Sequence, residues 1–436
     1  MTSATLHVGA RPRARGGARN GGARKGDAVL LIGSTGFLGR ELLFQLLTRS
    51  PAEITCVIRA RDQQGATARL HEMVSGLFGD QGWETVRDRV HAVCGDVTAH
   101  DLGIDRRTLD RLIRTTTHII HGAASVRFDL PLTQARRING QGTLRVLDVA
   151  RRACRYGRLR RLGYVSTAFV GGRHAHLFGE DDLDVGQSFR NSYEQSKFEA
   201  ELVVQAAMRE VPITVVRPSI IIGDSRSGAT SAFNVIYWPL KIYADGLLRY
   251  APADPRLPVD IVPVDFVARG ILEAVFRGEP DCTYALAAGD RATEAHVIAD
   301  MAARVFSTRP PRFLATPVER LVVPWLWPLL SAAPWKPFGG SVRVYLPYFR
   351  HGSRFDTSHA DALLQPRGIE APKPAEFLEP VLEFAMSTDF GRDRAMIAAR
   401  ERALRHQRHR ALLRASAPRR TRRRTAAPRT EELVRA

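Results

Sequence analysis

The chain has 436 residues, of which 44% are hydrophobic and 25% are charged, as in an ordinary soluble globular protein with a sizeable core. Its four cysteines are scattered without a CxxC pair, which argues against a disulfide framework or a zinc site and indicates a reducing, cytoplasmic compartment. The formal net charge of +19 is unusual, and it comes mostly from the two ends of the chain.

Both ends are predicted to be basic, disordered tails. Residues 1–25 carry a charge of +6 and residues 392–436 a charge of +11, so the body between them is nearly neutral at +2. The first stretch is rich in Gly and Arg and has no apolar run, which argues against a secretory signal. The second could begin as a basic helix before it becomes Pro/Arg-rich around Arg419–Arg424. Such a basic run could contact anionic lipid, whereas binding to nucleic acid is not favoured. The preferred interpretation is a tail that is solvated and has no partner.

From residue 27, short β-branched runs alternate with helical stretches. Strands separated by helices predict a parallel sheet with right-handed crossovers and helices on both faces, which is a doubly wound Rossmann-type α/β fold. A helix is expected over Arg40–Leu47, and a long amphipathic stretch occupies Gln134–Arg152. The expected strands are Ala28–Gly33, Ile54–Ile58, Val90–Cys94, Thr117–His121, Arg161–Ser166 and Ile213–Val216.

After about residue 218 the alternation weakens, and short apolar pieces with many prolines and aromatic residues follow. This composition predicts a substrate-side region packed over the carboxyl end of the sheet. Leu321–Trp335 is uncharged, but it is shorter than the roughly 18 residues of a membrane span and contains three prolines. An apolar pocket wall is therefore favoured over an interfacial segment, and Phe233–Tyr243 and Trp325–Trp335 could line a channel for an apolar ligand.

A glycine-rich turn follows the first strand and opens the first helix. Glycines at this place allow a tight turn and let backbone N–H groups approach a pyrophosphate at the helix N-terminus. Because the turn also begins a series of strands and helices, we interpret it as a dinucleotide site. Its residues are Gly33, Ser34, Thr35, Gly36, Phe37, Leu38 and Gly39.

The ends of the next two strands bear on which nucleotide is bound. An acid at the end of the second strand would bind the ribose 2′-hydroxyl of NAD, whereas an arginine accommodates the 2′-phosphate of NADP. Here Arg59 follows the strand and no acid appears before Asp62, so NADP(H) is favoured, with Arg61 or Arg40 assisting. Asp96 and Val97 end the third strand, where a carboxylate can accept from the adenine amino group; a simple turn is the alternative for Asp96.

Tyr193 and Lys197 lie four residues apart, on one face of a predicted helix. A phenol is a poor acid–base catalyst at neutral pH, but a neighbouring ammonium and a positive nicotinamide would lower its pKa. Thr167, at the end of the preceding strand, offers a hydroxyl that could hold a substrate carbonyl oxygen beside Tyr193. The three residues are candidates for an active site.

The order of motifs over residues 28–290 resembles that of an extended short-chain dehydrogenase/reductase. The resemblance implies that Thr167, Tyr193 and Lys197 form the catalytic triad, and that Lys197 also binds the nicotinamide ribose. Asn139 would support the active-site helix or a proton relay. Ala123 would lie where a loop passes the cofactor, and Pro218 and Ser219 would flank the nicotinamide. The motifs are the glycine turn, Gly95-Asp96, His121-Gly122-Ala123-Ala124, Asn139, Ser166-Thr167, Tyr193/Lys197 and Arg217-Pro218.

Four stretches narrow the resemblance to the fatty acyl-CoA reductases and carrier-protein thioester reductases, the branch with a male sterility-type NAD-binding domain. This implies that NADPH reduces an acyl thioester, carried by coenzyme A or an acyl carrier protein, to an aldehyde; a second reduction to an alcohol stays open. The stretches are Gly33–Gly39, His121-Gly122-Ala123-Ala124-Ser125-Val126, Tyr164-Val165-Ser166-Thr167-Ala168 and Asp260-Ile261-Val262-Pro263-Val264-Asp265.

Two other functions are compatible with the motifs. One is a dehydrogenase, reductase or epimerase of the same superfamily that acts on a sugar nucleotide or a sterol-like alcohol. The other is a redox-sensing, NADP-binding protein without catalysis, which retention of the triad disfavours. We expect an NADP-binding domain at 26–290 and a substrate-binding region at 291–391, between tails at 1–25 and 392–436. No metal is expected, and peripheral membrane contact stays open.

Overall fold

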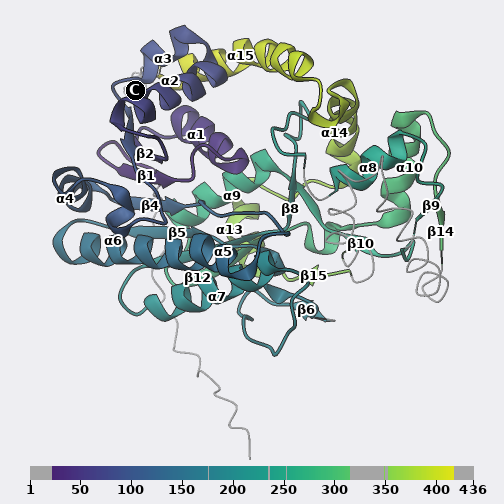
Figure 1. The fold of residues 1–436 in the computed structure, drawn as a ribbon, viewed down its shortest axis with the longest axis horizontal. Coiled ribbons are helices and arrows are strands. Elements are labelled where there is room, and N and C mark those ends of the chain that lie inside the picture. Colours follow the sequence, from purple (N-terminus) through teal and green to yellow (C-terminus); the bar gives the residue numbers. More distant parts are fainter. Residues whose placement is uncertain are drawn as a thin grey trace, which may run out of the picture.

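The computed structural model describes residues 22–174, 176–233, 236–251, 253–314, 348 and 352–416. Its central sheet consists of β1 (Ala28–Ile32), β2 (Glu53–Ile58), β3 (Val90–Cys94), β4 (His118–His121), β5 (Arg161–Val165), β7 (Ile213–Pro218) and β12 (Cys282–Leu286). The strands run in the order β12-β7-β5-β4-β1-β2-β3, and all their pairings are parallel (Figure 1). The predicted doubly wound Rossmann sheet is confirmed.

Helices cover both faces of this sheet because successive strand residues point to opposite sides, and both sides are apolar. In β1, Val29 and Leu31 belong to one core, whereas Leu30 and Ile32 belong to the other. The first core packs under α1 (Phe37–Arg49), α2 (Gln63–Phe78), α9 (Val264–Arg277) and α13 (Ser358–Leu364). The second packs under α4 (Arg106–Thr115), α6 (Gly142–Tyr156) and α7 (Ser192–Ala207).

The amphipathic stretch Gln134–Arg152 is interrupted by a π-helical turn. The chain passes from α5 (Leu132–Ala135) through η2 (Arg136–Gln141), which is the π-helical turn, into α6. Such turns are rare and are often found at functional sites. Here the turn carries Asn139, one of the predicted site residues.

A third apolar core lies beyond the carboxyl ends of the strands, as predicted for the region after residue 218. It is built mainly from α8 (Tyr237–Ala244), α10 (Ala295–Phe306) and α14 (Pro374–Ser387), on the right of Figure 1. Leu321–Trp335 lies outside the described residues. One pair of short strands joins this region to the rest: β6 (Leu177–Phe178) pairs with β15 (Arg354–Phe355). Three further pairs lie within the region: β8 (Ile220–Ile222) with β11 (Ile261–Pro263), β9 (Tyr250–Ala251) with β14 (Arg312–Phe313), and β10 (Pro258–Val259) with β13 (Thr293–Glu294).

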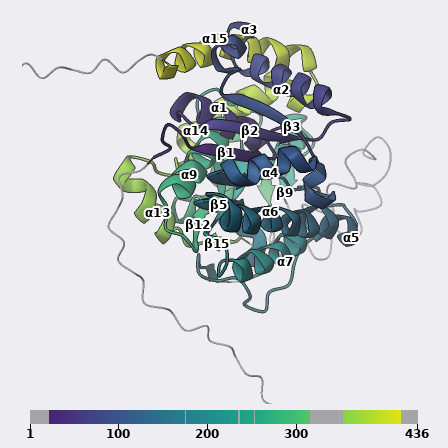
Figure 2. The same cartoon turned by 90° about the vertical axis from the view of Figure 1, so that its left-hand side faces the viewer.

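The stretch from residue 392 begins with the basic helix that the sequence allowed. This helix, α15 (Arg394–Ser416), returns across the molecule to lie against α1, α2 and α3 (Asp80–Val86), as Figures 1 and 2 both show. Leu412 is buried in the first core, and Arg405 Nε donates to the Gly76 carbonyl at 3.1 Å. The prediction of a disordered tail is therefore wrong for residues 394–416, because this helix packs against the first core. Residues 1–21 and 417–436 lie outside the described residues. Within the described ranges, no helix combines the length and apolar character needed to cross a bilayer.

Candidate active site

The glycine turn brings β1, β4 and α1 into close contact. Gly33 has φ +101°, and a Cβ built on it would lie 2.6 Å from the backbone nitrogen of Ala123, in the loop after β4. A Cβ on Gly39 would lie 2.0 Å from the Gly33 carbonyl oxygen. Only glycine fits at both positions, because any side chain would push these backbones apart. The backbone of the turn therefore lies as close to its neighbouring segments as the glycine motif predicts.

The N-terminus of α1 fits a phosphate group. Gly36 is its N-cap, no side chain caps it, and its first turn contains no acid. A Cβ on Gly36 would meet nothing closer than the Gly33 carbonyl oxygen at 3.5 Å, so a ligand can approach the backbone here. Uncapped N–H groups at the positive end of a 13-residue helix attract anions. These residues therefore fit the pyrophosphate of a dinucleotide.

The end of β2 presents arginine and no available acid. Arg59 is exposed directly after the strand. Asp62, the first acid beyond it, is the N-cap of α2, where its carboxylate accepts from the Gly65 N–H at 2.7 Å. After β3, Asp96 Oδ1 accepts from the Thr98 N–H at 2.8 Å, so this carboxylate has the turn role that the sequence left as an alternative. An adenine contact of Asp96 and Val97 stays a prediction.

The three predicted catalytic residues meet at the carboxyl edge of the sheet. Thr167 follows β5 and is buried, and it hydrogen-bonds the phenol of Tyr193 from α7. Burial raises the pKa of Tyr193 to about 12, although the hydrogen bond with Thr167 opposes the rise. The sequence predicts a lowered pKa from the Lys197 ammonium and a bound, positive nicotinamide together. Among the effects of the protein groups alone, burial of the phenol is the largest.

Those oxygens belong to β5. Lys197 Nζ donates to Tyr164 Oη at 2.7 Å and to the Val165 carbonyl at 2.8 Å. Burial lowers the pKa of Lys197 to about 7, against the attraction of the Glu201 carboxylate. Two of the three ammonium hydrogens are thus engaged, which leaves one for a further acceptor.

Asn139 joins the loop after β4 to helix α7. Its Oδ1 accepts from the Ser125 N–H at 2.8 Å, while Nδ2 donates to the Ser125 carbonyl at 3.2 Å and to Ser196 Oγ at 3.0 Å. Ser196 is adjacent to Lys197 on α7. This geometry is consistent with the implied support of the active-site helix.

A buried ion pair lies behind the site. Arg217, at the end of β7, donates to Glu201 Oε1 from Nε at 2.9 Å and from Nη2 at 2.6 Å, and the two side chains are 1% and 0% exposed. Ser166 Oγ also donates to Glu201. The guanidinium further binds the Asp182 carbonyl at 2.7 Å, which ties the loop after β6 to the sheet. Glu201 belongs to none of the motifs found in the sequence, although its position four residues after Lys197 places it on the same helix face.

Aromatic rings connect Tyr193 to the substrate-side region. Phe128 stacks on Tyr193 with 5.3 Å between ring centroids, and Tyr348 stacks on Phe128 at 5.7 Å. Tyr348 Oη donates to Glu194 Oε1 at 2.5 Å, and Glu194 forms a fully buried pair with Arg190 at 3.2 Å. No local motif predicts this arrangement, because its members come from separate parts of the chain.

An apolar cavity of about 150 Å³ continues from these rings. Phe169, two residues after Thr167, lines it together with Tyr348. Helices α8 and α10 contribute Leu240, Tyr243, Ile298 and Ala299 to its wall, and the segments between and after them contribute further apolar residues. Phe233–Tyr243 therefore contributes to the wall of a cavity, as the sequence suggested.

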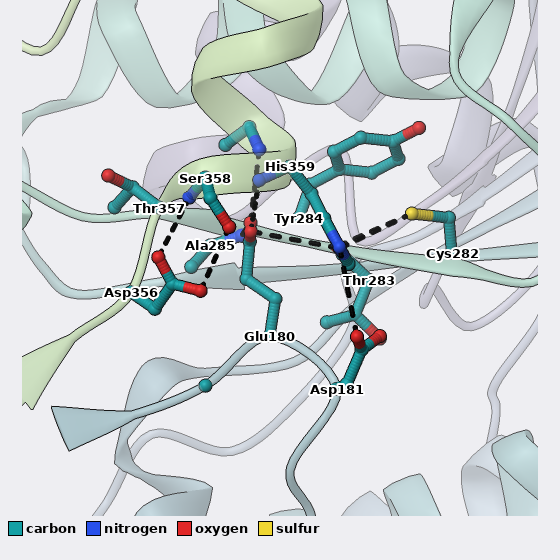
Figure 3. Close-up of polar contacts among 12 residues, drawn as sticks. Glu180, Asp181, Cys282, Thr283, Tyr284, Ala285, Asp356, Thr357, Ser358 and His359 are labelled. Carbon is teal, nitrogen blue, oxygen red and sulfur yellow. Dashed lines mark hydrogen bonds and ion pairs between the residues drawn. The ribbon is translucent and has the colours of Figure 1, made fainter. Parts of the chain in front are cut away.

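A second polar cluster joins the C-terminal segment to the edge of the sheet (Figure 3). The buried Glu180 carboxylate accepts from the Ala285 N–H on β12 at 2.6 Å and from the His359 and Ala360 N–H groups at the start of α13. Burial raises the pKa of Glu180 to about 7, although these backbone hydrogen bonds oppose the rise. One side chain thus connects a loop, a strand and a helix. Within the described part of the chain, no group of three or more His, Cys, Asp or Glu could hold a metal ion.

Comparison with known proteins decides the family. The family profile described as male sterility protein matches residues 31–271, which is more than half of the chain. The chain belongs to this family. The resemblance seen in the sequence, to the extended short-chain dehydrogenase/reductases of the fatty acyl-CoA reductase and thioester reductase branch, is thereby confirmed.

Relatives of this male sterility-family chain include parts of larger enzymes. Nonribosomal peptide synthetase asaC of Aspergillus flavus is 31% identical over 258 residues, covering 56% of this chain and 24% of asaC. Fatty acyl-CoA reductase wat of Drosophila melanogaster is 26% identical over 288 residues, covering 58% of this chain and 54% of that protein. The chain therefore spans about half, or much less, of these curated relatives.

A solved structure supports the same family placement over most of the fold. The terminal R domain of the myxalamid PKS-NRPS biosynthetic pathway matches with a TM-score of 0.72 and 26% identity. The match covers 84% of this chain and 91% of that domain. Together, these matches place the chain in a reductase-type family with a nicotinamide-binding domain.

Proposed function

We propose that this chain uses NADPH to reduce an acyl thioester to an aldehyde, with release of a thiol. The observation that carries the proposal is the position of the Thr167–Tyr193 hydroxyl pair next to an apolar cavity. Phe169 and Tyr348 line that cavity, and Tyr348 is linked to Tyr193 through Phe128. An acyl chain in the cavity would bring its thioester carbonyl to the two hydroxyls. An apolar wall suits an acyl chain better than the hydroxyls and phosphates of a sugar nucleotide.

The hydroxyl pair supplies the acid–base chemistry. When bound, NADPH supplies the hydride that adds to the carbonyl carbon. Thr167 and Tyr193 donate hydrogen bonds to the carbonyl oxygen, which becomes negative as the carbon is reduced. Tyr193 then transfers its proton to that oxygen; its pKa of about 12 means that it carries this proton at neutral pH. Cleavage of the C–S bond of the resulting hemithioacetal gives the aldehyde, and the sulfur leaves as a thiol.

The names of the relatives support a proposal for the thiol carrier. Its relatives are named as fatty acyl-CoA reductases and as nonribosomal peptide synthetases. We propose a thioester of coenzyme A or of an acyl carrier protein as substrate. The aldehyde would be the first product, and a second hydride transfer at the same site would give the alcohol.

A series of acyl-CoAs tests this function through the loss of NADPH absorbance. Because the cavity is apolar, kcat/KM is expected to rise with acyl chain length until the cavity is filled. Ala299→Trp, which places a large side chain in the cavity wall, is expected to shift the preference to shorter chains. Val297→Thr on the same helix, at an exposed position outside that wall, serves as the matched control. Absence of NADPH oxidation with every acyl-CoA and acyl carrier protein would refute the proposal.

Arg59 provides a separate test of the cofactor. Arg59→Glu removes the proposed contact with the 2′-phosphate and places a carboxylate there. We expect KM for NADPH to rise about 10- to 100-fold, the value of a hydrogen bond between charged groups, while KM for NADH changes little or falls. Arg87→Glu makes the same charge change at the exposed residue that follows α3. An equal loss with both nucleotides would contradict a specific phosphate contact.

A further inference from the structure

Residues of strand β5 supply the hydrogen-bond acceptors of the Lys197 ammonium group. The side chain is 2% exposed, and its Nζ donates to the Tyr164 phenol and the Val165 carbonyl. The same nitrogen lies 4.2 Å from the centroid of the Tyr164 ring, within the range of a cation–π interaction. Tyr164 therefore contacts the charge through both its oxygen and its ring.

The buried Thr143 hydroxyl contacts the Tyr164 phenol on its far side. Tyr164 is 1% exposed, and its hydroxyl hydrogen-bonds the Thr143 hydroxyl. Thr143 itself donates to the Asn139 carbonyl at 2.6 Å, and its oxygen lies 3.2 Å from His121 Nε2. The phenol oxygen is thus held between Thr143 and Lys197, and it accepts from Lys197 Nζ at 2.7 Å. Burial raises the pKa of Tyr164 well above its usual value, which keeps the phenol neutral.

Few other groups near Lys197 can stabilise its positive charge. Glu201 on α7 attracts it, but this carboxylate already accepts from Arg217 on β7 and from Ser166. On β4, burial and then the positive Lys197 lower the pKa of His121 to about 3, so this imidazole is neutral. Tyr193, on the same helix, carries its proton at neutral pH. A buried ammonium without adequate acceptors loses its proton, so the contact with Tyr164 matters for its charge.

We propose that Tyr164 is a positioning residue of the active site, which keeps Lys197 charged and holds it at the carboxyl end of β5. The inference rests on the proposed function, in which a charged Lys197 acts beside Tyr193. It adds to the triad a residue that is not among those lining the proposed substrate cavity. Thr143 and the Asn139 backbone form the outer part of the same support.

Replacement of Tyr164 by Phe tests the proposal through the titration of Lys197 itself. The chain contains five lysines, so protein labelled with ¹³C-lysine gives few side-chain signals, and the signal of Lys197 is the one lost in Lys197→Met. We expect this signal to titrate at about pH 7 in the full wild-type chain. In Tyr164→Phe the midpoint should fall by about one to two pH units, because a hydrogen bond to the charged form is lost.

Activity should follow the same titration. The alkaline limb of the kcat/KM profile is expected to move to lower pH in Tyr164→Phe, which lowers kcat/KM about tenfold or more at pH 8. Tyr284→Phe is the matched control: it removes another buried tyrosine hydroxyl of the sheet, which accepts from the Glu279 N–H at 2.8 Å and lies away from Lys197. The control should lose comparable stability without moving either the lysine titration or the activity profile.

Unchanged titration of Lys197 in folded Tyr164→Phe would overturn the proposal. If that variant does not fold, Thr143→Val takes its place; it removes the hydroxyl that holds the phenol beside Lys197 and should move the midpoint in the same direction by a smaller amount. No movement in Thr143→Val would overturn the proposal equally. Failure of the wild-type chain to reduce thioesters counts against the proposed function alone, since the lysine titration is measured without turnover.

Discussion

Tyr193→Phe is expected to lower kcat/KM for acyl thioesters by about 100- to 10,000-fold, the usual contribution of a positioned proton donor. The change removes only the hydroxyl, so the stacking of the ring on Phe128 at 5.3 Å is preserved. Affinity for NADPH, measured by fluorescence titration, should therefore stay near the wild-type value. Steady-state NADPH oxidation with a saturating acyl-CoA measures the loss.

A matched variant separates chemistry from packing. Tyr237→Phe removes a buried hydroxyl that accepts from the Gly223 N–H at 2.9 Å, outside the proposed catalytic residues. It should reduce stability slightly and leave kcat/KM within a few-fold of wild type. If Tyr193→Phe kept more than a tenth of the activity, the proton donor would have to be another group.

Glu201→Ala is expected to lower the free energy of unfolding by about 3–5 kcal/mol. The change leaves the Arg217 guanidinium, only 1% exposed, without its carboxylate, and it also removes the acceptor of Ser166. The cost is large because the remaining charge has been withdrawn from water without a partner. Urea denaturation followed by circular dichroism gives the difference in free energy.

Two comparisons show whether burial causes that loss. Glu210→Ala breaks the surface pair with Arg151, whose side chains are 57% and 36% exposed, and should cost no more than about 1 kcal/mol. The double variant Glu201→Met/Arg217→Met removes both charges and should recover much of the stability. A loss below about 1 kcal/mol for Glu201→Ala would mean that water reaches Arg217.

Local pattern predicts the first part of this fold well. The bounds expected for β3 match those observed, and β1, β2, β4, β5 and β7 differ by at most two residues at an end. Each of these strands is a short apolar run next to a helix of the same unit. Strand β12, Cys282–Leu286, was not predicted, because the chain between β7 and β12 builds short strands and helices of the substrate-side region. That insertion removes the regular alternation on which the prediction depended.

The candidate site, too, was predictable from the sequence only in part. Motif spacing identified Thr167, Tyr193 and Lys197, and the structure brings them to one edge of the sheet. The acceptors of the Lys197 ammonium could not be predicted, because they depend on which side of β5 the helix packs against. The raised pKa of Tyr193 has the same origin: the motif shows which charge is near in sequence, whereas burial depends on the whole fold.

The position of α15 has a consequence for how the chain folds during synthesis. Ribosomes release the N-terminal half first, so β1, α1 and α2 emerge long before Leu412 and the other residues of α15 that cover them. Phe44 on α1, which the Arg408 guanidinium overlies at 5.5 Å, would meanwhile lack that cover. The nascent dinucleotide-binding half would thus expose an apolar strip, which chaperones could bind until α15 has been made.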